Sequence, residues 1–291
     1  MKNLNLLLAF VCFFALKVNA QITTPQPSPF AKVSQVVGIT EVALEYSRPS
    51  VKGRKIFGDL VKFDKVWRTG ANRATKITFS DSVKVEGNKL AKGDYAILTI
   101  PNQQEWTVIF SKNLGTNEQN YNEKDDVLRV KVKPTATATL IENYTMGFNN
   151  LSGSAADLEL AWENTLVKVA IQTYVEEKVE KQIADFTNPA KDAGGFYAAA
   201  SYYYENNKDL TKAYDWITKS TNAQPQYWTM LLKARIEHKL QKYPEAIITA
   251  EKAAEMATNA KNEQYVEMSR KLVEEAKKLV PAMPAKGKKN K

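Results

Sequence analysis

The chain has 291 residues, enough for one or two hydrophobic cores, and 41 Lys and Arg against 32 Asp and Glu give it a formal net charge of +9. Its single cysteine, Cys12, lies within the first 20 residues, so disulfides, thiol catalysis and thiolate metal sites are excluded from the remainder. A single histidine also excludes metal sites built from several histidines.

The first 20 residues, MKNLNLLLAFVCFFALKVNA, have the pattern of a secretory signal peptide. Lys2 gives a positive start, an apolar run extends over residues 4–16, and Val18 and Ala20 provide the small residues before a cleavage position. The apolar run is shorter than the about 20 residues that a membrane-spanning helix needs. We therefore expect an exported protein, periplasmic or secreted after cleavage near Ala20, with no membrane span and no nucleic-acid partner.

Residues 21–30 contain three prolines and are predicted to form an extended linker. From residue 31 to residue 173, short runs rich in β-branched and aromatic residues, such as TKITFS and EWTVIF, alternate with Gly, Pro, Asn and Asp. Many short strands at this spacing predict an antiparallel β-sandwich. Near the end of this region, WENTLV is predicted to be a tight hairpin turn.

The apolar period changes to that of helices near residue 174, and residues 174–281 are predicted to form an all-α domain. Two series of positions in it differ by 33 residues, close to the 34-residue tetratricopeptide repeat, in which small residues let paired helices approach closely. We therefore expect tetratricopeptide-like helical hairpins. The first series is Ser201, Tyr204, Ala213, Ile217, Ser220 and Pro225, and the second is Ala234, Glu237, Ala246, Ala250, Ala253 and Thr258.

Residues 282–291 form a short basic tail with four lysines. Such a tail after prolines is typical of a solvated, disordered end. The alternative is that its lysines bind an anionic lipid or glycan.

Two adjacent segments of the predicted sandwich are rich in arginine. WRTGANRAT holds Trp67, Arg68 and Asn72, and the preceding SRPSVKGRKIFG adds Arg48 and Arg54. Arginine forks bind carboxylate and phosphate bidentately, so these residues predict a site for an anionic or sugar ligand, with Trp67 supporting the loop. The alternative is structural: the glycine and asparagine form a turn, and the arginines pair with acids inside the fold.

Catalytic and cofactor motifs are weak. Residues 53–58 have the glycine spacing of a phosphate loop, but Asp59 stands where lysine is required and would repel phosphate. His238 lies on a predicted helix among charged neighbours, and the oxygen-rich loop NEQNYNEKDD lacks the order of a calcium loop. We expect no cofactor and no metal, and an enzyme is less favoured, with carboxylate-based hydrolysis as the open alternative.

Aromatic residues are dense in the predicted helices. They are enriched at interfaces, so they predict a surface that binds an envelope protein or peptide. The alternative is that the rings pack between the helices. The residues concerned are Tyr203, Tyr204, Trp216, Tyr227 and Trp228.

The segment that runs from YSRPSVKGRKIFGDLVKFDKVWRTGANRATKITFS to EWTVIF closely resembles the family called domain of unknown function 2911, over roughly residues 30–172. The family consists of exported proteins, chiefly of Bacteroidota, often with helical repeats after the domain. The resemblance implies a β-rich exported domain with no established activity and no catalytic residues. One departure is Leu114-Gly115, where many members have Trp-Gly after the TVIF strand.

These observations favour a non-enzymatic binding or scaffolding protein of the cell envelope, which binds a partner through its helical repeats. The alternative is a small anionic or sugar ligand, with or without carboxylate-based hydrolysis, at the arginine-rich site of the β-domain.

Overall fold

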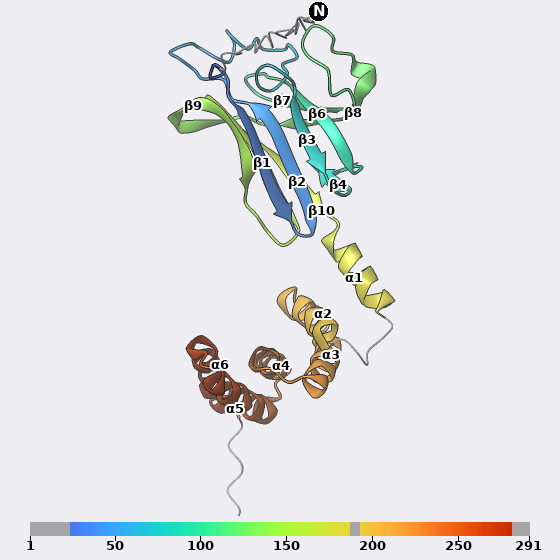
Figure 1. Ribbon diagram of the computed structural model, residues 1–291, viewed down its shortest axis with the longest axis vertical. Helices are drawn as coiled ribbons and strands as arrows, with labels where there is room; N and C mark the ends of the chain where they lie inside the picture. Colours follow the sequence, from blue (N-terminus) through green and yellow to red (C-terminus); the bar gives the residue numbers. More distant parts are fainter. Residues whose placement is uncertain (1–23, 187–192, 281–291) are drawn as a thin grey trace, which may run out of the picture. The chain divides into compact units, whose positions relative to one another are not determined.

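The computed structural model describes residues 24–186 and 193–280. The chain divides into two compact units, and the division falls between Val175 and Glu176. Figure 1 shows that the first unit is built from strands and the second from helices. The predicted fold class, antiparallel sheets followed by an all-α region, is confirmed.

Several predictions concern segments outside the described residues. These are the signal peptide (1–20), the basic tail (282–291) and residues 21–23 of the linker. The rest of the linker runs without regular structure into the first strand at Phe30. In the part of the chain that the structure describes, no helix is both long enough and apolar enough to cross a membrane.

The first unit contains two sheets, and all pairings within them are antiparallel. The six-stranded sheet has the order β1 (Phe30–Val37), β2 (Thr40–Ser47), β3 (Thr75–Phe79), β6 (Gly93–Ile100), β7 (Trp106–Ser111) and β8 (Asp126–Val132). The four-stranded sheet has the order β5 (Asn88–Leu90), β4 (Val83–Val85), β10 (Ala155–Thr173) and β9 (Thr135–Asn149). A 3₁₀ turn, Glu123–Asp125, precedes β8.

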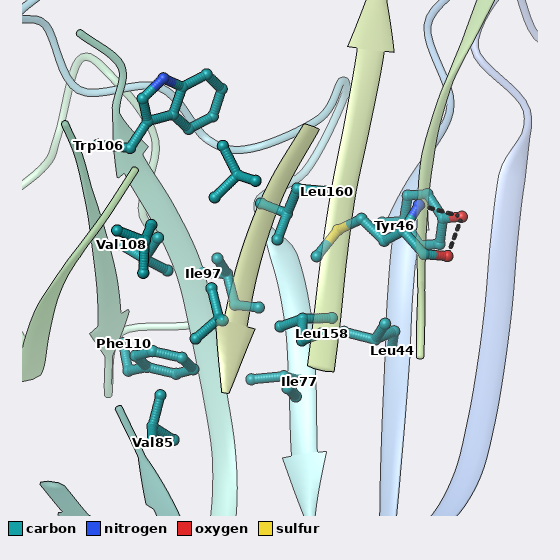
Figure 2. Close-up of a cluster of buried hydrophobic side chains, with 14 of the residues drawn as sticks. Leu44, Tyr46, Ile77, Val85, Ile97, Trp106, Val108, Phe110, Leu158 and Leu160 are labelled. Carbon is teal, nitrogen blue, oxygen red and sulfur yellow. Dashed lines mark hydrogen bonds between the residues drawn. The ribbon is translucent and has the colours of Figure 1, made fainter. Parts of the chain in front are cut away.

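The two sheets share one hydrophobic core. Alternating residues of β2, such as Leu44 and Tyr46, point into it, as the period of a half-buried strand requires. Figure 2 shows these side chains and those of the neighbouring strands opposite Leu158 and Leu160 of β10. The Tyr46 hydroxyl donates to the Met146 carbonyl oxygen at 3.0 Å and accepts from the Met146 amide at 2.9 Å, which ties the sheets together.

The outer face of the six-stranded sheet is covered in part by the loop that contains WRTGANRAT. A small second cluster on this face joins Ala96, Leu98 and Ile109 with Val66 and Ala74 from the loop. Because both faces of β6 are covered there, its residues form a continuous apolar run rather than an alternating one. The loop is thereby held against the sheet at both of its ends.

The predicted hairpin at WENTLV is wrong. Residues 155–173 form the single strand β10, whose register against β9 shifts on both sides of Glu163. Glu163 has a φ of 54°, so the chain bulges at this position and continues in the same direction. The Glu163 carboxylate accepts the Ile56 amide at 3.2 Å, which links the bulge to the loop before β3.

The second unit consists of six helices in its described part, and from the second helix on each one packs against the next. Ala213 and Ala246, which occupy equivalent positions of the predicted repeat, are both fully buried, as close helix pairs require. The starts of the third and fifth helices, Leu210 and Tyr243, are 33 residues apart. The helices are α1 (Val175–Asp185), α2 (Ala193–Glu205), α3 (Leu210–Ala223), α4 (Tyr227–Lys239), α5 (Tyr243–Asn259) and α6 (Glu263–Lys277).

Candidate functional site

A cavity of 580 Å³ lies beside the arginine-rich loops of the β-sheet unit. Four of the five predicted ligand-binding residues line it: Arg54, Trp67, Arg68 and Asn72. The other lining residues are Pro27, Ser28, Pro49, Ser50, Lys52, Leu60, Val61, Gly70, Ala71, Glu118 and Trp162. The structure therefore brings together segments that are far apart in the sequence.

The turn that forms one wall is rigid and strained. Trp67 and Thr99 exchange two backbone hydrogen bonds of 2.8 and 2.9 Å, so the turn is fixed to β6. Thr69 is fully buried with a φ of 58°, which a β-branched residue rarely adopts. Its carbonyl oxygen accepts the Thr75 hydroxyl at 2.5 Å, which closes the turn. Strain of this kind costs about 1–3 kcal/mol and persists where the surrounding structure fixes it.

Aromatic rings form the floor. Trp67 is stacked on Trp162 with ring centres 5.9 Å apart, and its edge meets Phe57 and Tyr144. The Trp67 indole N–H donates to the Gly70 carbonyl oxygen at 3.1 Å. Trp67 thus links the aromatic cluster to the turn at Gly70.

Arg68 is neutralised by Glu118. Its guanidinium forms a two-pronged ion pair with the carboxylate at 2.6 and 2.8 Å, and its backbone amide donates to the same carboxylate at 3.0 Å. A further N–H of Arg68 donates to the Asn72 carbonyl oxygen at 2.8 Å. Burial favours a raised pKa for Glu118, but the hydrogen bonds from Arg68 outweigh it and hold the pKa below its usual range.

Arg54 differs from Arg68 because it has no acidic partner in the part of the chain that the structure describes. Its guanidinium donates to the carbonyl oxygens of Val51 at 3.0 Å and Ser50 at 2.6 Å. Among the described residues, no carboxylate lies within ion-pair distance of Arg54 or of the exposed Lys52. The cavity therefore has three cations and one carboxylate in its lining, and the excess charge is at the loop that holds Arg54.

Asn72 and Arg48 have different positions. Asn72, with a φ of 62°, donates from its side-chain amide to the Ser47 hydroxyl at 3.1 Å and to the Ser28 carbonyl oxygen at 3.3 Å. It thus ties the linker to the wall of the cavity. Arg48 lies outside the lining and donates to the Tyr144 carbonyl oxygen and the Thr145 hydroxyl at 3.0 and 2.7 Å. The structure does not bring Arg48 into the cavity.

Sequence reasoning missed Glu118 and Trp162. Glu118 is 50 residues from Arg68 in a loop that resembles only a solvated turn, and Trp162 lies in the segment interpreted as a hairpin. Trp162 and its neighbour Tyr144 are almost fully buried, and the indole N–H and the hydroxyl have no hydrogen-bond partner among the described residues. Burial raises the pKa of Tyr144 well above its usual value, so the hydroxyl stays protonated.

The comparison with protein families agrees with the extent of this unit. Residues 28–171 match the family model described as Protein of unknown function (DUF2911). The matched segment, the DUF2911 domain, begins just before β1, ends within β10 and contains every residue of the cavity lining except Pro27. Comparison with curated proteins and with solved structures gave no match.

The predicted partner-binding aromatics lie outside the DUF2911 domain and form two separate groups. In the first, the Tyr203 hydroxyl donates to Glu180 at 2.7 Å, and its ring lies 4.8 Å from that of Trp216. The Lys239 ammonium lies 4.3 Å from the centre of the Tyr204 ring. These side chains belong to the cluster that joins α2, α3 and α4, so they contribute to helix packing.

The second group is at the start of α4. The rings of Tyr227 and Trp228 meet edge to face at 4.7 Å, and Tyr227 also meets Tyr265 of α6 at 4.8 Å. The Asn262 side-chain amide donates to the Tyr227 hydroxyl at 3.3 Å. The five aromatics are thus not lined up along one groove, although all except Tyr203 are partly exposed.

An apolar groove of 510 Å³ lies between α1, α2 and α3. Of the predicted aromatics, only Trp216 lines it. Its other lining residues are Val179, Gln182, Ile183, Phe186, Gly195, Phe196, Ala198, Ala199, Tyr202 and Lys219.

No group of three or more metal-ligating side chains of the His, Cys, Asp and Glu types is present in the described residues. His238 is half-buried on α4, next to the ring of Tyr243 at 5.4 Å. The oxygen-rich loop folds on itself: the Asn120 side chain accepts the Asn117 amide at 2.7 Å and donates to the Gly115 carbonyl oxygen at 3.2 Å.

Proposed function

We propose that the DUF2911 domain binds a small anionic ligand in the cavity beside Arg54. The observation that carries this proposal is the state of Arg54. Its guanidinium is oriented by two carbonyl oxygens, which do not neutralise it, and no carboxylate of the described chain is within ion-pair distance. A guanidinium group that is fixed in orientation and has no neutralising partner is suited to bind a carboxylate or phosphate group.

The size and lining of the cavity support a small molecule. Its volume of 580 Å³ falls in the range of about 300–1,000 Å³ that ligand pockets occupy. Trp67 and Trp162 contribute small apolar areas to the lining, since most of each ring is buried, and Ser50 and Asn72 add polar groups. A sugar acid combines these requirements, because it has a carboxylate, hydroxyl groups and an apolar ring face.

Binding rather than hydrolysis is the activity that this lining favours. Hydrolysis of a glycosidic bond uses two carboxyl groups about 5–9.5 Å apart on either side of the bond. Glu118 is the only carboxylate of the cavity lining, and its ion pair with Arg68 keeps it deprotonated. A deprotonated, paired carboxylate is a poor general acid.

A thermal-shift screen of the full chain against sugar acids, phosphate and neutral sugars tests the proposal. We expect at least one anion to raise the melting temperature of the wild type and of Arg270→Ala, an exposed arginine of α6, but not of Arg54→Ala. A panel in which no anion stabilises the protein contradicts it. So does an equal shift in Arg54→Ala.

A second candidate function, binding of an envelope protein or peptide, is supported by the groove between α1, α2 and α3. Trp216 lines this groove, and Trp228 does not, although both are partly exposed tryptophans of the helical unit. A partner captured by the wild type should be lost with Trp216→Ala and retained with Trp228→Ala. Retention by both variants contradicts the groove as the binding surface.

Export is part of both proposals. The pattern of residues 1–20 supports cleavage near Ala20. Mass spectrometry of the native protein should find Gln21 as its first residue. An uncleaved chain in the cytoplasm contradicts export.

A further inference from the structure

A second cavity adjoins the first. It has a volume of 410 Å³, and Asn72 lines both cavities. Its other lining residues are Phe30, Glu45, Tyr46, Ser47, Arg73, Ala74, Lys76 and Leu114. Asn72 is therefore part of the walls of both cavities, and its hydrogen bonds to Ser47 and Ser28 hold it in place.

The second cavity also has an uncompensated cation. Arg73 is exposed, and its guanidinium has no hydrogen bond or ion pair with the described part of the chain. Lys76, in contrast, forms an ion pair of 3.2 Å with Glu45. Hydrogen bonds from Lys76 and Lys32 keep the pKa of Glu45 below its usual value despite partial burial, so this carboxylate stays paired.

Apolar side chains lie beside these charges. Phe30 is 66% exposed and Leu114 is 46% exposed, and both line the second cavity. An exposed aromatic ring next to a cation provides a surface on which the apolar face of a sugar ring stacks while its carboxylate is bound. The lining of the first cavity also places aromatic side chains, Trp67 and Trp162, with Arg54, but there both rings are largely buried.

From this repetition we propose that the two cavities form one continuous site for an anionic oligosaccharide, with successive acidic sugars on either side of Asn72. This inference rests on the proposed anion binding in the first cavity and adds the ligand class. A small anion would occupy only one cavity and would leave Arg73 without a role. Linked acidic sugars would use both unpaired arginines and both apolar surfaces.

Titration calorimetry with galacturonic acid and its α-linked dimer, trimer and tetramer tests this inference. For the wild-type full chain, we expect affinity to rise by about tenfold or more from monomer to trimer, because the second contact becomes intramolecular. Arg54→Ala should weaken the binding of all lengths. Arg73→Ala should leave the monomer affinity unchanged and remove the gain with length. Arg270→Ala should resemble the wild type, and circular dichroism should find all three variants folded.

The outcomes separate this inference from the proposed function. If the monomer binds through Arg54 but length or Arg73 makes no difference, the second cavity is not part of the site, and only the oligosaccharide is excluded. If no acid of any length binds, both proposals fail. If an acidic peptide of matched charge, such as hexaglutamate, binds more tightly than the tetramer, the ligand class is wrong.

Discussion

Arg68 and Glu118, which are 50 residues apart in the sequence, form a two-pronged ion pair at the wall of the main cavity. The pair has two consequences. It fixes the WRTGANRAT turn to the loop before β8, and it removes one of the predicted cationic ligands from the available charge. Arg54, whose partners among the described residues are carbonyl oxygens, is left as the principal anion-binding group of the proposed site.

Glu118 should make the stability of the DUF2911 domain depend on pH. Its pKa in the folded protein lies below the ordinary value of 4.5, so the pair contributes stability above that value. This contribution is lost as pH falls through the folded-state pKa. In Glu118→Gln it should be absent at every pH, with a loss of about 1–3 kcal/mol at pH 7. Urea unfolding of both proteins from pH 7 to pH 3 should give curves that converge at low pH; a constant difference would contradict the assignment.

The same substitution should strengthen anion binding. Removal of the Glu118 charge leaves Arg68 uncompensated and raises the excess positive charge of the lining from two to three. Because the site is partly exposed, we expect a gain of about two- to fivefold in affinity for galacturonic acid, which corresponds to the small energy of exposed charge pairs. Calorimetry at low and high salt measures it. Weaker binding by Glu118→Gln in spite of an intact fold would mean that the carboxylate itself contacts the ligand.

Gly70 should be intolerant of a side chain. It has a φ of 154°, and an added Cβ would meet the Ser47 carbonyl oxygen and the Thr75 hydroxyl at 3.2 Å. Gly70→Ala should therefore cost about 1–3 kcal/mol of the free energy of unfolding. Gly87→Ala is the matched control, because Gly87 also has a positive φ but nothing lies near its added Cβ. Equal losses in the two variants would mean that the packing at the turn does not matter.

Ionisation of the buried Glu237 carboxyl should lower the stability of the helical unit as pH rises. Only 2% of its surface is exposed, one carboxylate oxygen has no hydrogen-bond partner within residues 24–186 and 193–280, and the Lys233 ammonium is 4.0 Å from the carboxylate. Burial raises its pKa above that of the unfolded chain, so the native state retains its proton longer. Stability is therefore greatest below the unfolded-state pKa and falls as pH rises through the folded-state pKa.

In Glu237→Gln this loss should disappear, with a gain of about 1 kcal/mol at pH 8 and little change at pH 4. Helical circular dichroism during thermal unfolding measures it. Glu255→Gln, at an exposed position of α5, is the control and should follow the wild type. A lower melting temperature for Glu237→Gln at pH 8 would contradict the prediction and indicate that the ion pair with Lys233 is net stabilising.

Local patterns were sufficient to predict most of the strands and helices and four of the residues that line the main cavity. The alternation in TEVALEYS predicts the buried face of β2, and the arginines near WRTGANRAT indicate the cavity because they lie on two loops that the sheet brings together. Gly70 and Asn72 mark the turn correctly, since both have positive φ. These features depend on neighbouring residues, which a sequence displays directly.

The errors concern contacts between distant segments. The pairing of Arg68 with Glu118 depends on loop positions that no local pattern encodes. The residues of WENTLV suit both a hairpin turn, in which the chain reverses, and a β-bulge, in which it continues. The pairing of β10 with β9 and the hydrogen bond between Glu163 and Ile56 favour the bulge. Arg48 was predicted to be a ligand, but the ladder places it next to the β9 carbonyl of Tyr144.

The most direct test of the central claim is a calorimetric titration of galacturonic acid into the wild-type full chain, Arg54→Ala and Arg270→Ala. We predict saturable binding in the wild type and in Arg270→Ala, and an affinity about tenfold lower or lost in Arg54→Ala, as expected for a charged hydrogen bond of about 1.5–3 kcal/mol. Equal affinities for Arg54→Ala and the wild type, with all three proteins folded, would contradict an anion site beside Arg54.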